Sequence, residues 1–309
     1  MFGLMAKCIF GRDGLLGRHF IGGTALQRDW YASISRMARC RSISRRKNIV
    51  QQVSSMHRRR WSIPKEKGIL VVPAEHIPEA SNVIRAAKNL VGNQEEIWAR
   101  KKKSKPQLVS DLLPQSMITL DSAYMEFGLR EDILSVVAAY LGMVPILASI
   151  EVWLSLPSAV PEWGNSQLYH CDWADISQVK VFVHVSNVFL ENGPLTVINS
   201  DTSNKVRDKI GYQFIGGNRL PDKVIRPLID PGEEYALTGP AGTVCFVDTS
   251  KCFHYGSRVL DNSTARTLII YQFVNPSAFI FPLGHGKGHP FEHLCHSQLS
   301  ELQQLVLGK

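Results

Sequence analysis

The sequence predicts a mainly β protein with flanking helices, in which N-terminal α-helices precede a jelly-roll (cupin-like) core of the double-stranded β-helix type. The first observation is a series of eight short β-rich runs between residues 151 and 274, separated by turn residues. Eight short strands in one domain are typical of a jelly-roll double sheet. The second observation is the helical spacing of apolar residues before this region. The third is the length of 309 residues with 44% hydrophobic residues, which suffices for a sizeable core.

The basic residues of the chain gather in residues 1–60, which we expect to form a separate N-terminal extension. This segment holds 13 of the 35 Lys and Arg residues but only two of the 27 acidic residues, Asp13 and Asp29. The rest of the chain is therefore mildly acidic, although the chain as a whole carries a net charge of +8.

Three interpretations of residues 1–60 stay open. The favoured one is a solvated or disordered extension, including sequence upstream of a true start at Met37 or Met56. An acid-poor, Arg- and Ser-rich start also resembles a mitochondrial transit peptide. The third is a basic arm for nucleic acid or an anionic membrane. No aromatic-interleaved nucleic-acid motif supports that arm, so we do not expect nucleic acid as a partner.

Residues 61–309 are expected to form the folded domain, which begins with two helices. Apolar residues recur at helical spacing in residues 74–103, and a basic run at 100–103 suits a helix C-terminus. A second helix fits residues 120–141, with Gly142 as its stop signal.

The eight predicted strands follow as the core of this domain, in residues 151–276. They are separated by Gly and Pro residues and lie at 151–156, 167–170, 179–188, 194–199, 234–237, 242–247, 254–259 and 267–274. A long gap of about 30 residues separates the fourth strand from the fifth. We expect residues 200–232 to be a functional loop, acting as a lid and substrate selector.

Cysteine spacing and hydropathy bear on the cell compartment. The six cysteines show no paired spacing, so a disulfide scaffold or a CxxC zinc or redox motif is not expected. A reducing compartment is the default interpretation. We therefore expect a cytoplasmic protein, or a mitochondrial one if residues 1–60 are a transit peptide. No apolar run reaches the roughly 18–20 residues of a transmembrane segment.

A metal site is predicted by His170, Asp172 and His254. His170 and Asp172 are two residues apart, so on a continuing strand their side chains point to the same face. His254 opens the seventh predicted strand, which can lie beside the second in a jelly roll. Two imidazoles and one carboxylate can bind one face of Fe(II), and would also take Zn(II), Mn(II) or Co(II).

Arg266 is the candidate for binding an anion near this metal. An arginine at the edge of a strongly apolar strand is costly to bury unless an anion pairs with it. Guanidinium binds carboxylates in a bidentate fashion. A salt bridge to a loop acid is the alternative, and Arg258, which also follows His254, is a rival for the role.

With these residues in view, the stretch from 151 to 276 resembles the phytanoyl-CoA dioxygenase family of Fe(II)/2-oxoglutarate oxygenases. The resemblance covers about 126 of the 309 residues. It extends more loosely to the helical region from about residue 70. The motifs that carry it are Gln167-Leu168-Tyr169-His170-Cys171-Asp172, Val179-Lys180-Val181-Phe182-Val183-His184-Val185, Asn192-Gly193-Pro194-Leu195, Gly239-Pro240-Ala241-Gly242-Thr243, Phe253-His254-Tyr255-Gly256-Ser257 and Arg266.

The resemblance implies the cofactors and the reaction. His170, Asp172 and His254 would bind Fe(II), and Arg266 would bind the C5 carboxylate of 2-oxoglutarate, with O2 as the second co-substrate. Decarboxylation to succinate would accompany hydroxylation of a small molecule, such as a lipid, a sugar-derived compound or a secondary metabolite. The related halogenases have a small residue in place of the carboxylate ligand, so Asp172 favours hydroxylation. Family membership does not fix the substrate or the oligomeric state.

Further residues are candidates for contacts around this site. Gln167 would contact the metal ligands or the co-substrate, or else pair with the neighbouring strand. Thr243 is a candidate of the same kind. The aromatic residues that would line the pocket, or pack in the core, are Trp153, Tyr169, Trp173, Phe182 and Tyr271.

Two other functions are compatible with the sequence, and histidines gather in one further cluster near its end. The chain would alternatively be a catalytically inactive jelly-roll protein that kept the metal and ligand site, or a nucleic-acid or membrane-associated protein that uses the basic arm. The cluster consists of His285, His289, His293, Cys295 and His296. Glycines interrupt any helix there, so we expect a loop that leads into a terminal helix at 292–307, and not a zinc site.

Overall fold

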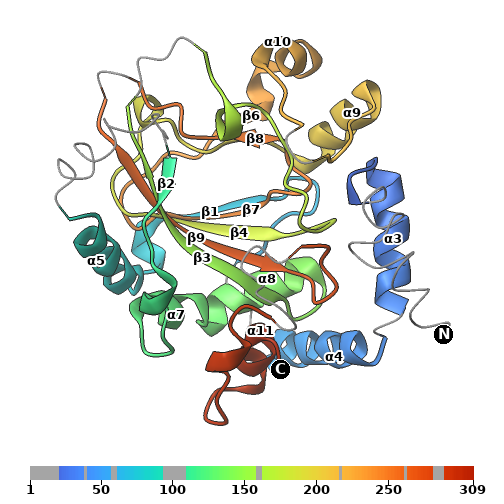
Figure 1. Cartoon of the computed structure of the whole chain (residues 1–309), viewed down its shortest axis with the longest axis vertical. Helices are drawn as coiled ribbons and strands as arrows, with labels where there is room; N and C mark the ends of the chain where they lie inside the picture. Colours follow the sequence, from blue (N-terminus) through green and yellow to red (C-terminus); the bar gives the residue numbers. More distant parts are fainter. Residues whose placement is uncertain are drawn as a thin grey trace.

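The computed structural model describes residues 21–37, 40–56, 61–92, 109–157, 162–215, 218–260, 263–280 and 289–309. In these stretches two antiparallel β-sheets face each other, and helices flank the larger sheet (Figure 1). No described helix is long and apolar enough to cross a membrane.

The larger sheet has six strands in the order β1-β7-β4-β9-β3-β2, and all neighbouring pairs are antiparallel. Val, Ile and Phe dominate its central strands because these are buried on both faces. The strands span Ile69–Val72 (β1), Val109–Asp111 (β2), Ile146–Ser155 (β3), Val179–His184 (β4), Val244–Asp248 (β7) and Arg266–Val274 (β9).

Side-chain alternation sorts this sheet into two faces. On β4, Val179, Val181 and Val183 belong to the large apolar core under the helices. Phe182 packs in the second core between the sheets. By the same alternation Lys180 and His184 point to the interior between the sheets.

The smaller sheet has three strands in the order β6-β5-β8, at Glu234–Ala236 (β6), Thr196–Ile198 (β5) and His254–Tyr255 (β8). Residues 169–170 extend it, because His170 forms an antiparallel bridge with His254 and Tyr169 with Leu220. The second core contains residues of both sheets, such as Phe182 of β4 and Val197 of β5, so it packs the two sheets together.

The face of the larger sheet that points away from the smaller one is covered by helices (Figure 1). These are Cys40–Met56 (α4), Ala80–Val91 (α5), Ala123–Gly128 (α7), Glu131–Leu141 (α8) and Glu301–Leu307 (α11). Three other helices lie beside the smaller sheet and at the ends of the strands, at Ala25–Met37 (α3), Ser200–Ile210 (α9) and Asp222–Ile225 (α10).

The eight predicted strands all contain β pairing, although the run at 167–170 is reduced to two bridge residues. The strands β1 and β2 were not predicted. Both lie ahead of residue 151 and have only four and three residues, too few for alternation to stand out.

The predicted helix at 120–141 is two helices. Ser122 caps α7, with its Oγ accepting a hydrogen bond from the Met125 N–H at 3.2 Å. Arg130 is extended and begins α8. Gly142 ends α8 in the left-handed conformation, which confirms it as the stop signal. Of the helix predicted at 74–103, the described part contains α5, and residues 93–108 lie outside the described residues.

The expectation of a long loop at 200–232 is wrong, because α9 and α10 lie there. The Asn199 side chain caps α9 by accepting a hydrogen bond from the Thr202 N–H at 2.8 Å. Most residues of α9 are polar, even on its buried side, which includes Val206. The sequence therefore lacks the apolar spacing from which a helix could be predicted. Whether this segment selects the substrate stays a prediction.

The expectation of a solvated or disordered N-terminal extension is wrong for residues 25–37 and 40–56, which form α3 and α4. Tyr31 and Ala32 of α3 are buried, as is Ile49 of α4. Arg28 and Arg46 are also buried, and both donate hydrogen bonds to backbone carbonyls. The expectation was based on the high arginine content of residues 1–60 and assumed that these arginines are solvated. Because Arg28 and Arg46 are buried, that assumption led to the wrong result.

The predicted terminal helix at 292–307 is confirmed only as α11, because Ser300 and Gln303 form a capping box at its start. His285 lies outside the described residues. His289, His293, Cys295 and His296 do not form a metal-type cluster among the described residues.

Candidate metal centre

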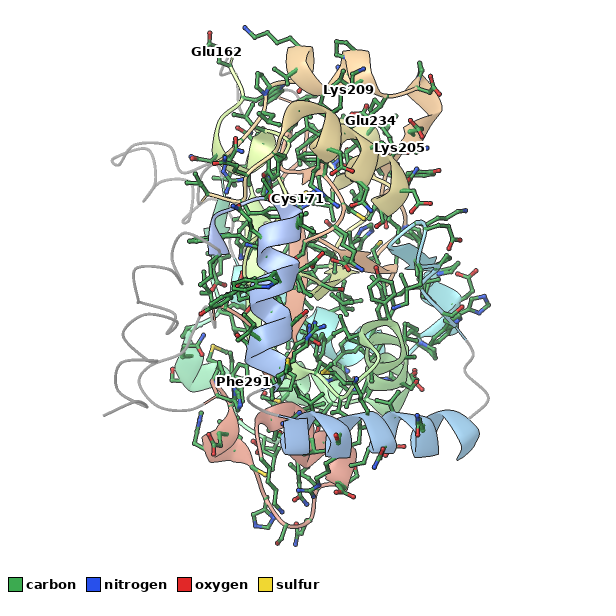
Figure 2. All side chains as sticks on the ribbon, turned by 90° about the vertical axis from the view of Figure 1, so that its right-hand side faces the viewer. Glu162, Cys171, Lys205, Lys209, Glu234 and Phe291 are labelled. Carbon is green, nitrogen blue, oxygen red and sulfur yellow. The ribbon has the colours of Figure 1, made fainter. Side chains whose placement is uncertain are left out.

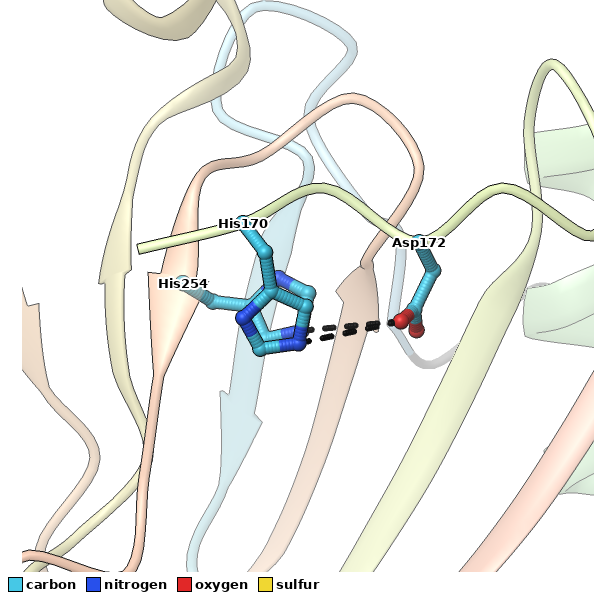
Figure 3. A group of neighbouring side chains, drawn as sticks. All are labelled: His170, Asp172 and His254. Carbon is cyan, nitrogen blue, oxygen red and sulfur yellow. Dashed lines mark ion pairs between the residues drawn. The ribbon is translucent and has the colours of Figure 1, made fainter. Parts of the chain in front are cut away.

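The structure brings His170, Asp172 and His254 together between the two sheets (Figure 3). His170 and His254 exchange two backbone hydrogen bonds of 3.0 Å, so their rings lie next to each other. Asp172 Oδ1 is 3.9 Å from His170 Nε2 and 4.0 Å from His254 Nε2. One ligand atom from each residue therefore faces a common point, which makes the three a metal-binding triad.

The orientation of both imidazoles is fixed through their other nitrogen. His170 Nδ1 lies 2.9 Å from the Leu168 carbonyl oxygen, and His254 Nδ1 lies 3.0 Å from the Cys252 carbonyl oxygen. A carbonyl only accepts, so each Nδ1 carries the proton and each Nε2 offers its lone pair. Such backing of a ligand histidine is a regular feature of metal sites.

Asp172 is held by two neighbours that sequence reasoning did not single out. Its Oδ2 accepts hydrogen bonds from Lys180 Nζ at 2.8 Å and from Gln178 Nε2 at 2.9 Å. Burial alone would raise the pKa of Asp172, but the ammonium group of Lys180 lowers it far below its usual range. The carboxylate is therefore ionised, and Oδ1 stays turned toward the histidines.

Both histidines are neutral in the folded protein. Burial is the largest cause that lowers the pKa of His170 and of His254 below the ordinary value. Neutral imidazole is the form that binds a divalent metal, and this donor set suits Fe(II) and its neighbours in the transition series.

Arg266 lies on the inward face at the first residue of β9 and is 4% exposed. Its guanidinium donates hydrogen bonds to the Gly193 carbonyl, to Ser257 Oγ at 2.9 Å and to Ser155 Oγ at 3.2 Å. Burial lowers its pKa to about 10, so it remains charged at neutral pH. No carboxylate of the described residues pairs with it, so the alternative of a salt bridge to a loop acid is not found.

Polar atoms without partners gather near Arg266. His184 on β4 and Trp153 on β3 both pair with Leu268, so all three share the inward face with Arg266. His184 Nδ1, Trp153 Nε1, Thr243 Oγ1 and Arg266 Nε are buried and have no hydrogen-bond partner within the described part of the chain. Unsatisfied buried polar atoms are uncommon, and a cluster of them indicates a place for a polar ligand.

The other predicted contacts are placed differently. Gln167 is buried, with Nε2 donating to the Ser257 carbonyl at 2.8 Å and Oε1 accepting from the Gly164 N–H, so it fits the strand-pairing alternative. Tyr271 points into the helix-covered core, where its hydroxyl donates a hydrogen bond to the Tyr124 carbonyl at 3.0 Å, so it fits the core-packing alternative and does not line the pocket. Arg258 pairs with Asp222 at 2.6 Å and stacks on Tyr255, so it is not free to bind an anion.

Sequence reasoning also missed how α3 holds the ligand-bearing segment. Arg28 donates hydrogen bonds to the carbonyls of Trp173 at 3.1 Å and Asp175 at 2.8 Å, immediately after Asp172. Figure 2 faces this side of the molecule and shows α3 in front of the sheets, with Cys171 near its upper end. The hydrogen bonds of Arg28 go to backbone carbonyls, which every residue has. The sequence therefore contains no acidic partner from which the burial of Arg28 could be predicted.

The stability of the metal-free protein is expected to fall as the pH drops from about 6.5 toward 4. Burial and the charge of Arg266 lower the pKa of His184 to about 4, whereas an unfolded histidine titrates near 6.5. Between these values the unfolded chain binds a proton that the folded chain does not, so acid favours unfolding, by up to about 3 kcal/mol for this residue. Urea denaturation at a series of pH values checks it. The His184→Met variant should lose part of this dependence, and an unchanged dependence would contradict the role of His184.

Comparisons with known proteins find similar solved structures, but no protein-family model and no curated protein matches the chain. EctD from S. alaskensis with bound Fe is 16% identical, with a TM-score of 0.47 over 69% of this chain and 74% of that one. The epimerase SnoN in complex with Fe3+, alpha ketoglutarate and nogalamycin RO is 12% identical, with a TM-score of 0.42 over 75% and 85%. HygX from Streptomyces hygroscopicus with nickel and 2-oxoglutarate bound is 16% identical, with a TM-score of 0.42 over 68% and 83%. Likenesses at this level carry no information on the activity of this chain.

Proposed function

We propose that the chain is an Fe(II)- and 2-oxoglutarate-dependent dioxygenase that hydroxylates a small molecule. One observation carries the proposal: the interior between the two sheets holds both a metal-binding triad and a buried arginine without a counter-anion among the described residues. A buried cation is costly unless an anion joins it. The interior is therefore suited to a metal together with an anionic ligand.

The donor set fits Fe(II). Two neutral imidazoles and one ionised carboxylate on one side of an ion leave the opposite positions free for other ligands. Iron with a bound 2-oxo acid supplies the oxidising power that couples decarboxylation to hydroxylation. Asp172 is a carboxylate where the related halogenases have a small residue, which favours hydroxylation.

The surroundings of Arg266 fit the distal carboxylate of 2-oxoglutarate. Ser155 and Ser257 hold the guanidinium in place, and His184 Nδ1 and Thr243 Oγ1 still lack partners. A planar guanidinium binds a carboxylate through two parallel hydrogen bonds. The apolar residues between the sheets, among them Phe182 and Ile270, keep water away from the reacting groups.

The finer assignments belong to the same proposal. The order of strands and the triad on the second and seventh predicted strands support a double-stranded β-helix. The motifs around His170, His254 and Arg266 support membership of the phytanoyl-CoA dioxygenase family. The reducing compartment stays a prediction; it agrees with free cysteines at 171, 245, 252 and 295.

Turnover of 2-oxoglutarate tests the proposal. Purified protein supplied with Fe(II), 2-oxoglutarate and O2 should release succinate, at least slowly, without any added substrate. If the protein binds neither iron nor 2-oxoglutarate, the proposal is wrong. If it binds both but forms no succinate, the chain is the catalytically inactive binding protein instead.

Replacing Arg266 by glutamine is expected to weaken 2-oxoglutarate binding by about 10- to 100-fold, since a charge-assisted hydrogen-bond pair is lost. Iron affinity in the absence of 2-oxoglutarate should change little, because Arg266 is not a metal ligand. Calorimetric titrations under nitrogen measure both, with iron added to the metal-free protein and 2-oxoglutarate added to the iron-loaded protein. Arg266→Lys keeps the charge and should lose less; equal 2-oxoglutarate affinity in all three proteins would contradict the assignment of Arg266.

A further inference from the structure

Arg219 is held beside the strand that carries His170. The Tyr169 N–H donates to the Leu220 carbonyl at 3.0 Å, and the Leu220 N–H donates back at 2.8 Å. The Tyr212 hydroxyl accepts from the Cys171 N–H at 3.2 Å and donates to the Asn218 carbonyl at 3.0 Å. The residues on both sides of Arg219 are therefore tied to the metal-ligand segment.

The guanidinium of Arg219 has no partner among the described residues, and its Nη1 is buried. The other arginines between residues 200 and 260 are all engaged. Arg207 bonds the Lys251 carbonyl and Asn204, Arg226 pairs with Asp222 and Glu234, and Arg258 pairs with Asp222. Arg219 therefore stands apart as the guanidinium of this stretch that is free to bind an anion.

Arg219 lies on the same side of this segment as the metal ligand His170. Tyr169 and Leu220 form an antiparallel bridge. In an antiparallel pairing the residue after Tyr169, which is His170, therefore lies opposite the residue before Leu220, which is Arg219. Opposite residues point to the same face, so the Arg219 side chain lies on the side of the metal centre.

The buried Nη1 of Arg219 calls for an anion. A guanidinium nitrogen that is buried without a partner is costly unless an anion joins it. Once 2-oxoglutarate fills the site at Arg266, the substrate is the ligand left to supply that anion.

Resting on the proposed function, we propose that the substrate carries an anionic oxygen group, a carboxylate or a phosphate, which the Arg219 guanidinium binds beside the metal centre. Both groups present the oxygen pair that guanidinium recognises. Arg219 is then a specificity-determining residue, and the substrate class narrows to small molecules that carry a carboxylate or a phosphate.

Binding of simple oxyanions tests this proposal. The probes are inorganic phosphate and acetate, titrated calorimetrically under nitrogen into protein saturated with Fe(II) and 2-oxoglutarate, so that the Arg266 site is filled. The wild-type protein should bind at least one of them, and Arg219→Gln should bind it about 10- to 100-fold more weakly. Arg219→Lys, which keeps the charge, should retain part of the affinity. The stronger probe tells a phosphate from a carboxylate.

The matched control is Arg226→Gln, since Arg226 lies in the same segment but is exposed and already paired with two acids. It should bind the probe like the wild type. Equal probe binding by wild type and Arg219→Gln, no probe binding by the loaded wild type, or an equal loss in the control would overturn the inference. So would weaker 2-oxoglutarate binding in Arg219→Gln with unchanged probe binding, because Arg219 would then serve the co-substrate.

Failure of the proposed function has a separate signature, because the wild type would then either bind no iron and 2-oxoglutarate or form no succinate from them. The same titrations on the metal-free proteins still compare Arg219→Gln with wild type. A difference between them would support an oxyanion site at Arg219, and no difference would overturn it.

Discussion

Replacing Asp172 by alanine is expected to lower the iron affinity more than 100-fold and to abolish succinate formation. Losing a partner behind a metal ligand typically costs about 10- to 100-fold in affinity, and losing the ligand itself should cost more. Lys180 adds to the loss, because its ammonium group is left without Asp172 and then repels the metal. Iron titration under nitrogen and succinate measurement give the two readouts.

A double variant separates the loss of the ligand from damage to the fold. Asp172→Ala leaves Lys180 as an uncompensated cation in the interior, so the free energy of unfolding should fall. Asp172→Ala combined with Lys180→Met removes that cation and should recover stability without recovering iron binding. Stoichiometric iron binding by the single variant would contradict the assignment of Asp172 as a ligand.

The triad was predictable because its geometry is mostly local. The spacing of two residues turns the side chains of His170 and Asp172 to the same side, although Asp172 lies just beyond the bridge residues and not on a strand. The bridge between the two histidines then brings His254 alongside. Arg266 was predictable from its position at the start of an apolar strand. The sequence could not tell whether Arg266 binds a ligand or forms a salt bridge with an acidic residue. The structure decided this, because no carboxylate of the described residues pairs with Arg266.

The residues around the triad were harder to predict because their roles depend on which face of a strand is inward. Lys180 and His184 lie four residues apart in β4, on the face opposite its three valines, so the sequence did carry a signal: two polar residues on one face of a buried strand. Without the register, that pattern could not tell the interior between the sheets from the helix-covered face. Arg219 gave no such signal, since it lies in a polar segment whose attachment to Tyr169 is nonlocal.

Replacing Arg28 by alanine is expected to destabilise the protein by about 2–5 kcal/mol and to weaken iron binding about 10-fold or more. Arg28 is 1% exposed and lies between the rings of Phe214 and Phe279, at 4.2 and 4.9 Å from their centroids. Its loss leaves the Trp173 and Asp175 carbonyls without their donor, directly after the ligand Asp172. Urea denaturation and iron titration of the full chain measure the two effects.

Arg45→Ala is the control for Arg28→Ala, because Arg45 lies on the neighbouring helix α4 but forms an exposed ion pair with Glu301. Such a pair contributes about 1 kcal/mol or less, so stability and iron affinity should stay near the wild type. If Arg28→Ala behaved like this control, the ligand segment would be held by other contacts, such as Asp175 with Asn275. If the expected losses are found, α3 is required to hold the segment that carries the metal ligand Asp172. The transit-peptide hypothesis would then fit only residues that precede α3, because cleavage after this helix would remove the arginine that holds the ligand segment.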